Sequence, residues 1–251
     1  MSIASRVSHI RAISFDGDMT LWDFEKAMRH SLYHALAEVQ KHLPEHACAD
    51  LTIERMIEIR NTVAGELNGK RLTLEQIRFE AFRGTLSSMR SNNDELAAYL
   101  NEVWLKHRFE DIELYPDVLP TLDLLGSRYA LGLISNGNSY PERCGLRERF
   151  TFVVLSQDLG VEKPDPAIFR AACRKVGYSP RQLLHVGDSL ETDAAGAFRA
   201  GALSFWLNRT LKPNRTDIRP HCEIHALTDL EDFLDPNPHR TSRNVLDHMS
   251  A

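Results

Sequence analysis

The chain has 251 residues, of which 43% are hydrophobic and 26% charged, and its formal net charge is −5. This length fits one large domain, or a main domain with a smaller insert, and the composition is that of a globular protein with a sizeable core. The negative charge argues against a nucleic-acid polymer or an anionic membrane as partner. No apolar run approaches the length of a membrane span, and residues 1–10 lack the apolar segment of a secretory signal, so we expect a cytoplasmic protein.

The four cysteines are widely scattered and form no C-x-x-C pair. We interpret them as buried free thiols in a reducing compartment. They are Cys48, Cys144, Cys173 and Cys222.

The first predicted element is a strand that ends at Asp16, within the stretch RAISFDGDMTLWD. A second acid, Asp18, follows one residue later, and Thr20 comes next. Oxygen ligands in this pattern suit a hard divalent cation. An EF-hand loop starts similarly but needs Gly at its sixth position and Glu at its twelfth, where this chain has Leu21 and Ala27. The remaining alternative is a strand that ends in a plain turn, where Asp is common.

A run of helical patterns occupies residues 23–113. Apolar residues recur at helical spacing in four segments, and no strand pattern separates them. The third segment opens with a capping box of Thr73 and Gln76, and Asn93 caps the fourth. Four amphipathic helices of this kind predict a small bundle inserted after the first strand. We therefore assign residues 23–113 to a helical cap domain.

From about residue 114 the pattern becomes alternating strands and helices. It predicts a doubly wound parallel sheet, a Rossmann-like α/β core, with its chemistry at the carboxyl edge of the strands. We assign residues 1–22 and 114–235 to this core and expect 236–251 to be a loose tail. The predicted strands are 129–136, 150–156, 183–188 and 203–208, and the predicted helices are 118–125, 165–176 and 191–200.

Two groups of polar residues lie next to predicted elements of this core, one at the end of the strand 129–136 and one before the helix 165–176. Ser135 and Asn136 come just after an apolar strand, where a hydroxyl and a backbone N–H can hold a phosphate oxygen; the alternative is a plain turn. Lys163 precedes a helix that Asp165 caps and Pro166 opens. A helix N-terminus favours anions and the ammonium adds a positive charge, whereas the alternative is a solvated surface lysine.

Another acidic pair follows the strand 183–188. Gly187 permits a tight backbone there, and Asp188 emerges at the edge of the sheet. Asp193 lies five residues further on, in the first turn of the next helix, where an acid can simply complement the helix dipole. The alternative is that Asp188 binds a metal ion directly and Asp193 supports it from outside the ligand set.

Taken together, these groups resemble the motif set of the haloacid dehalogenase superfamily, and the helical insert lies where that family carries its helical C1 cap. The later part of the chain most resembles the branch of pyrimidine 5′-nucleotidases and N-acylneuraminate-9-phosphate phosphatase. The family usually has a bulkier residue at position 17 and often Gly at position 19. Here these are Gly17 and Met19, and Gly17 loosens the backbone that presents Asp18. The matching residues are Asp16, Asp18, Thr20, Ser135, Asn136, Lys163, Pro164, Gly187, Asp188 and Asp193.

The resemblance implies a Mg²⁺-dependent phosphatase. Asp16 would be the nucleophile that forms an aspartyl-phosphate, and Asp18 would protonate the leaving alcohol and then activate water. The carboxylates of Asp16 and Asp188 and the backbone carbonyl of Asp18 would hold the metal, with Asp193 outside the ligand set. Substrate contacts would come from Ser135, Asn136, Lys163 and Thr20.

Arg78 and Arg83 on the third helix of the cap, and Trp22 beside the motif loop, are candidates to contact the leaving group; the alternative is surface charge and core packing. True dehalogenases of the superfamily lack the second acid, so Asp18 favours phosphate chemistry. We expect a small phosphorylated metabolite as partner, such as a nucleoside monophosphate or a sugar phosphate, and a monomer or homodimer. A phosphomutase of the same fold and a non-catalytic binding protein are the alternative functions.

Overall fold

A computed structural model of the chain describes residues 3–67, 69–70 and 72–234. The chain divides into two compact units, with boundaries after Leu21 and after Glu113. The first unit contains the sheet, and the second, residues 22–113, is helical. The predicted tail 236–251 lies outside the described residues. Within the described ranges, no helix is both long enough and apolar enough to cross a membrane.

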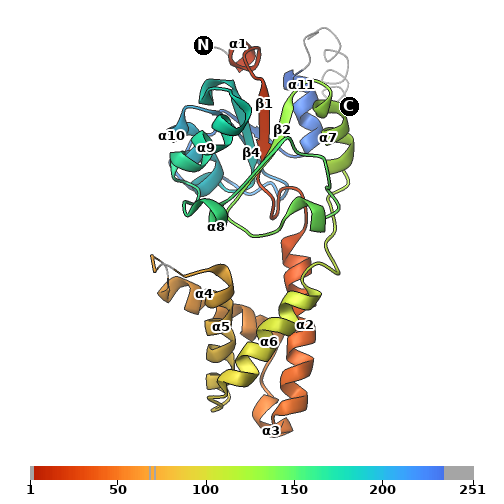
Figure 1. Cartoon of the computed structure of the whole chain (residues 1–251), viewed down its shortest axis with the longest axis vertical. Helices are drawn as coiled ribbons and strands as arrows, with labels where there is room; N and C mark the ends of the chain where they lie inside the picture. Colours follow the sequence, from red (N-terminus) through yellow and green to blue (C-terminus); the bar gives the residue numbers. More distant parts are fainter. Residues whose placement is uncertain (1–2, 68, 71, 235–251) are drawn as a thin grey trace, which may run out of the picture. The chain divides into compact units, whose positions relative to one another are not determined.

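Six parallel strands form one sheet in the first unit, in the order β3-β2-β1-β4-β5-β6. The first strand lies between β2 and β4 (Figure 1). The chain adds β2 and β3 on one side of β1 and then crosses over to add β4 on the other. The carboxyl ends of these three strands therefore meet at the topological switch point, where such sheets bind ligands. The strands are β1 Ala12–Phe15, β2 Ala130–Ser135, β3 Phe152–Leu155, β4 Leu183–Gly187, β5 Leu203–Leu207 and β6 Cys222–Ile224.

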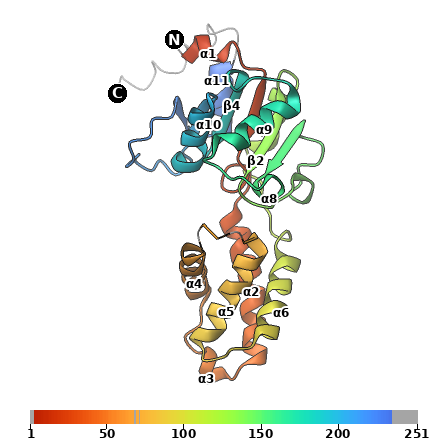
Figure 2. The same ribbon diagram turned by 60° about the vertical axis from the view of Figure 1, so that its left-hand side comes forward.

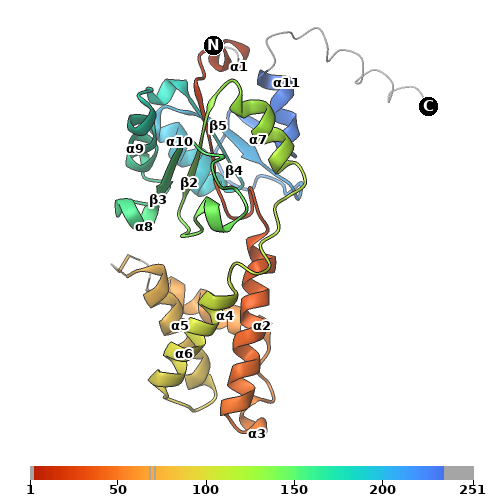
Figure 3. The ribbon, with the colours of Figure 1, turned by 45° about the vertical axis from the view of Figure 1, so that its right-hand side comes forward.

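Helices cover both faces of this sheet, with α9 and α10 on one face and α7 and α11 on the other (Figures 1 and 3). Strand β1 is buried along its whole length, as expected for a parallel strand covered on both faces. The helices of this unit are α1 Ile3–Val7, α7 Val118–Gly126, α8 Ser156–Leu159, α9 Pro166–Val176, α10 Ala195–Ala200 and α11 Leu230–Leu234.

The second unit is a bundle in which α2 packs against α6 and α4, and α5 packs against α4 and α6 (Figure 2). An apolar cluster that includes Leu32, Phe82 and Leu100 fills it. The predicted capping box of Thr73 and Gln76 is present, and Asn93 accepts a hydrogen bond from the N–H of Leu96. The helices are α2 Phe24–His42, α3 Glu45–Cys48, α4 Ile53–Glu66, α5 Leu74–Ser88 and α6 Asp94–His107.

The predicted fold class is confirmed, and the differences are local. The predicted helix 191–200 begins as a π-helical turn, Leu190–Ala194, before α10. The short elements α1, α3, α8, β6 and α11 were not predicted, because three to five residues carry too little periodicity. The four cysteines are free thiols; all are buried except Cys222, which is partly exposed.

Candidate active site

Polar residues follow β1, β2 and β4 at one edge of the sheet. The N–H of Asp16, directly after β1, donates to the carbonyl of Val186 in β4 over 2.9 Å. Ser135 ends β2, and Asp188 comes directly after β4. Parallel pairing thus brings Ser135 and Asp188, which come 119 and 172 positions after Asp16 in the sequence, to the same edge.

The ammonium group of Lys163 lies between two carboxylates. Its Nζ is 2.5 Å from Oδ1 of Asp16 and 2.6 Å from Oδ1 of Asp193. Lys163 is only 3% exposed, so it is not the solvated surface lysine of the alternative interpretation. A buried ammonium held by two carboxylates is fixed in place, because either partner left alone would be a costly unpaired charge.

Both oxygens of Asp193 are engaged. Oδ1 also accepts from Nε2 of His185 over 3.0 Å, and Oδ2 accepts from the backbone N–H of Ser189 over 3.0 Å. On the other side of the imidazole, Nδ1 of His185 accepts from the hydroxyl of Ser14 over 2.8 Å. The carboxylate of Asp193 is therefore occupied in holding Lys163 and the Ser189 N–H, and its support of a metal ion stays a prediction.

Burial and neighbouring charges shift the acidity of these groups in opposite directions. Burial raises the pKa of Asp16 although Lys163 opposes it, and burial with the nearby Asp193 raises the pKa of Asp188 to about 6. Burial acts in the same sense on Asp193, but Lys163 and His185 outweigh it and hold the pKa of Asp193 below its usual range. Burial also lowers the pKa of His185, which favours the neutral imidazole.

Asn136 ties the loop after β2 to the loop that carries Lys163. Its Nδ2 donates to the carbonyl of Lys163 over 2.9 Å, and its Oδ1 accepts from the N–H of Lys163 over 2.7 Å. The Asn136 side-chain amide is thus occupied in joining the two loops. Beside it, the N–H of Gly137 donates to Oγ of Ser135 over 3.0 Å. A Cβ atom at Gly137 would lie 2.8 Å from Oδ2 of Asp18, which places the Asp18 carboxylate at this loop.

The loop after Asp16 is tightly wound. The N–H of Leu21 donates to the carbonyl of Gly17 over 2.8 Å. Met19 has a φ of 64°, which is a left-handed conformation, and position 19 is the one at which the resembling family often has Gly. The guanidinium of Arg209 donates to the carbonyl of Thr20 over 2.9 Å. Oγ1 of Thr20 is buried without a hydrogen-bond partner among the described residues.

The acids at this edge suit a hard cation. Carboxylate oxygens of Asp16, Asp188 and Asp193 lie within 4.8 Å of one another, and Asp188 is partly exposed. Oxygen donors of this kind are the ligands that Mg²⁺ prefers. Because both oxygens of Asp193 already have partners, Asp16 and Asp188 are the carboxylates that fit the ligand role.

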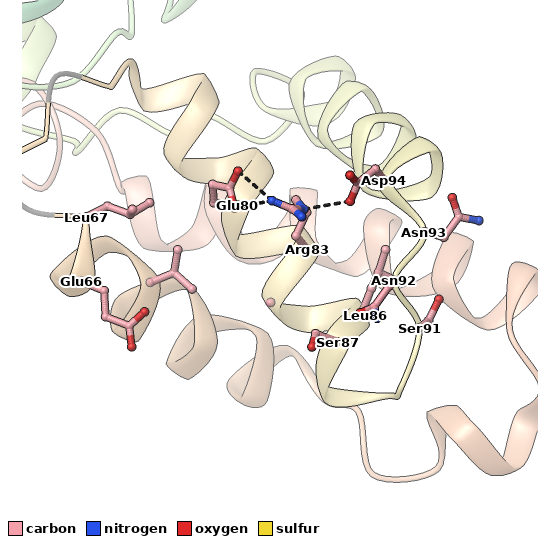
Figure 4. A pocket seen from close by; sticks show the side chains of 12 residues that line it. Glu66, Leu67, Glu80, Arg83, Leu86, Ser87, Ser91, Asn92, Asn93 and Asp94 are labelled. Atoms are coloured by element: carbon pink, nitrogen blue, oxygen red, sulfur yellow. Dashed lines mark hydrogen bonds and ion pairs between the residues drawn. The ribbon is translucent and has the colours of Figure 1, made fainter.

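The three candidate residues of the helical unit have distinct environments. Arg83 is exposed and pairs with Glu80 and Asp94 at the wall of a pocket (Figure 4). Arg78 is half-buried, with its guanidinium 3.8 Å from the centre of the Trp104 ring, and burial lowers its pKa to about 9. Trp22 is fully buried. A substrate role for any of them stays a prediction.

Two residues of this site were missed by the sequence interpretation. Ser14 and His185 are polar residues within otherwise apolar strands, and they face each other in the pairing of β1 with β4. A polar residue in a fully buried strand needs a partner. The need for a partner therefore marked both residues in the sequence. It shows that they pair with each other only once the register of β1 against β4 is known.

The site combines a doubly wound parallel sheet with acids and a buried lysine at the carboxyl edge of its strands. This is the arrangement that the haloacid dehalogenase resemblance predicts. Residues 10–201 match the haloacid dehalogenase-like hydrolase family, and the chain is a member of that family.

Relatives with established names include several phosphatases. The N-acylneuraminate-9-phosphatase of Homo sapiens is 27% identical, over 91% of this chain and 95% of that protein. The pyrimidine 5′-nucleotidase YjjG of Escherichia coli is 33% identical, over 54% of this chain and 63% of that enzyme. The glyceraldehyde 3-phosphate phosphatase of Methanopyrus kandleri is 36% identical, over 51% of this chain and 59% of that enzyme. In the last two cases the match spans less than two thirds of the relative.

Among solved structures, a 2-haloacid dehalogenase from Pseudomonas syringae pv. Tomato has a TM-score of 0.73 and 32% identity, over 90% of this chain and 98% of that one. The predicted family, fold class and hydrolase activity are thereby confirmed, together with the resemblance to the N-acylneuraminate-9-phosphatase and pyrimidine 5′-nucleotidase branch.

Proposed function

We propose that the chain is a Mg²⁺-dependent phosphatase that cleaves the phosphate monoester of a small metabolite through an aspartyl-phosphate. The observation that carries the proposal is the arrangement around Asp16. Its carboxylate is buried and held by the ammonium of Lys163, while a second acid, Asp18, lies next to the loop after β2. An acid fixed at the end of a buried strand is a preorganised nucleophile.

In the first step an oxygen of Asp16 attacks the phosphorus atom, and the bond from phosphorus to the ester oxygen breaks. The departing alkoxide needs a proton, which we assign to Asp18. In the second step the carboxylate of Asp18 takes a proton from water as that water attacks the aspartyl-phosphate. This releases inorganic phosphate and restores Asp16. Each turnover thus returns both acids to their starting states.

The approach of a phosphate dianion to a carboxylate is repulsive, and positive charge must offset it. Lys163 supplies one such charge, and its bonds to Asp16 and Asp193 fix its position before substrate arrives. The hydroxyl of Ser135 and the N–H of Asn136 are the neutral donors that we assign to the phosphoryl oxygens.

Asp16 and Asp188, with the backbone carbonyl of Asp18, are the groups that would hold Mg²⁺. The chemistry the cation supplies when bound is neutralisation of these acids and of the transferring phosphoryl group. The raised pKa values of Asp16 and Asp188 fit this assignment, because burial among like charges leaves the acids short of positive charge.

A phosphorylated sugar acid or sugar, or a nucleoside monophosphate, is the substrate class that we propose. The support is the near full-length match to the human N-acylneuraminate-9-phosphatase and the partial match to a pyrimidine 5′-nucleotidase. We further propose that residues 22–113 act as the cap of the active site, by resemblance to the family.

The similarity to a solved 2-haloacid dehalogenase makes dehalogenation the second candidate. A departing halide needs no proton, whereas a departing alkoxide does, so Asp18 has a task in the phosphatase and none in the dehalogenase. Retention of this acid favours the phosphatase.

The deciding experiment measures phosphate release from p-nitrophenyl phosphate, N-acylneuraminate 9-phosphate, nucleoside monophosphates, sugar phosphates and phosphoglycolate, with Mg²⁺ and with a chelator. Halide release from 2-chloropropionate is measured in parallel, and isomerised product is sought to detect a phosphomutase. We expect Mg²⁺-dependent phosphate release and no halide. Halide release without phosphatase activity would overturn the proposal, and failure on every phosphate ester would favour a binding protein.

A further inference from the structure

A second group of potential metal ligands lies in the helical unit, and it shares no residue with the acids of the sheet. His30 and His34 are four residues apart on α2 and therefore lie on one face of that helix. His107 is the last residue of α6, and Glu110 lies in the turn that follows. One ligand atom from each of the four residues lies within 4.8 Å of the others. We propose that this cluster binds a divalent transition-metal ion of the Zn²⁺ class.

The imidazole rings meet across the packed pair α2 and α6. The rings of His34 and His107 are stacked, with centroids 3.6 Å apart and an interplanar angle of 7°. The ring of His30 lies 4.8 Å from that of His34. Two ligands of a tetrahedral zinc ion, with bonds of about 2.1 Å, are about 3.4 Å apart. The ligand atoms of the four residues already lie within 4.8 Å of one another, and a side-chain rotation that unstacks His34 from His107 would direct both of their nitrogens at a single ion.

Glu110 marks the point where the side chains converge. Its Oε2 is 2.5 Å from Nδ1 of His107 and 3.5 Å from Nε2 of His30. One carboxylate oxygen therefore faces imidazole nitrogens from two different helices. An ordinary ion pair of His107 with Glu110 would not need two further imidazoles at the same place, whereas a four-ligand site does.

A further carboxylate, that of Asp111, lies near His30 on the side away from Glu110. While Nε2 of His30 faces the cluster, its Nδ1 is 4.0 Å from Oδ2 of Asp111. Asp111 thus adds negative charge beside His30 at a distance longer than a hydrogen bond. Asp111 is itself held, because the ammonium of Lys26 lies 3.5 Å from its Oδ1.

The ligand types select the class of ion. Three imidazoles and one carboxylate suit Zn²⁺, Ni²⁺ or Cu²⁺, whereas the carboxylates of the sheet suit Mg²⁺. An ion can also reach the site, because the His30 and Glu110 side chains are 30% and 47% exposed. Once bound, it would cross-link the middle of α2 to the end of α6, so its binding energy would stabilise the helical unit.

The test is calorimetric titration of the metal-free, full-length chain with Zn²⁺, alone and with Mg²⁺ in excess. A variant with Asp16→Asn and Asp188→Asn removes competition from the acids of the sheet. We expect one equivalent of Zn²⁺ to bind to that variant, and the melting temperature of the protein to rise on binding. His34→Gln and His107→Gln should each weaken binding at least tenfold. His46→Gln, at an exposed histidine on the neighbouring α3, is the matched control and should bind as the parent does.

The Co²⁺ form of the wild-type protein supplies a readout that depends on no variant. Tetrahedral ligation by imidazoles gives intense visible absorption, whereas carboxylates and water in octahedral geometry give weak bands. Absence of the intense bands would overturn the proposal. So would Zn²⁺ binding that vanishes in the variant with Asp16→Asn and Asp188→Asn, or that survives unchanged in both His34→Gln and His107→Gln.

Discussion

Replacing Gly137 by alanine tests the acid–base role of Asp18 while leaving that residue in place. The new Cβ atom would lie 2.8 Å from Oδ2 of Asp18 and 3.3 Å from Oγ of Ser135. An ordinary contact starts at 3.4 Å, so the Asp18 carboxylate must move by about 0.6 Å. Misplacement by 1 Å can cost about a hundredfold in rate, and we therefore expect kcat to fall about tenfold to a hundredfold.

The same substitution should barely change stability. The φ of Gly137 is not in the left-handed region, and the atom in its way is the end of a partly exposed side chain. We expect the free energy of unfolding to change by less than about 1 kcal/mol. Gly65→Ala is the control: it lies in α4, where a Cβ meets nothing within 4 Å. It should leave kcat unchanged and stabilise the helix by up to about 1 kcal/mol.

The assay compares two substrates with Gly137→Ala and the parent enzyme. An alkyl phosphate has a leaving group that needs a proton, whereas p-nitrophenolate leaves with little help. We expect the loss of kcat to be larger for the alkyl phosphate. Equal losses on both substrates, or no loss on either, would refute the reasoning that Asp18 protonates the leaving group.

Three further predictions concern the acids. Asp16→Asn should abolish turnover because it removes the nucleophile, and should leave the circular dichroism spectrum unchanged because Lys163 keeps its bond to Asp193; substantial residual activity would contradict the assignment. Gly187→Ala should lower the free energy of unfolding in urea by about 1–3 kcal/mol, since its Cβ would lie 2.2 Å from Cγ of the buried Asp193. The pKa of Asp188 is raised to about 6, so below that pH the metal-free protein keeps a proton that Mg²⁺ must displace. The rise in melting temperature with Mg²⁺ should therefore shrink as pH falls from 7.5 to 5, and Asp188→Asn should show no such rise at any pH.

The sequence located the acids and Lys163 because each follows a strand or precedes a helix, and these positions can be read from apolar runs and caps. It could not show that Lys163 is buried between two carboxylates, since burial depends on which loops pack together. His185 was missed for a related reason. It looks like an ordinary residue of an apolar strand until pairing with β1 sets it opposite Ser14.

The histidine cluster of the helical unit shows the same limit at longer range. His30 and His34 are visible as a pair on one helix, but His107 lies 73 residues after His34 in the sequence. Only the packing of α2 against α6 joins them. Local periodicity predicts which face of each helix is apolar, but it does not predict which polar residues of two helices meet at the rim of that interface.

In the mechanism proposed above, the buried charges favour both a cation and a proton on Asp18. With His185 neutral, the carboxylates of Asp16, Asp188 and Asp193 face the single ammonium of Lys163, which leaves two negative charges. One divalent cation would balance them, and a phosphate dianion would then meet a neutral site. An ionised Asp18 would restore a negative charge beside the incoming phosphate. In the proposed mechanism the proton on Asp18 would therefore serve twice, since it would lower repulsion while the substrate binds and then be donated to the leaving oxygen.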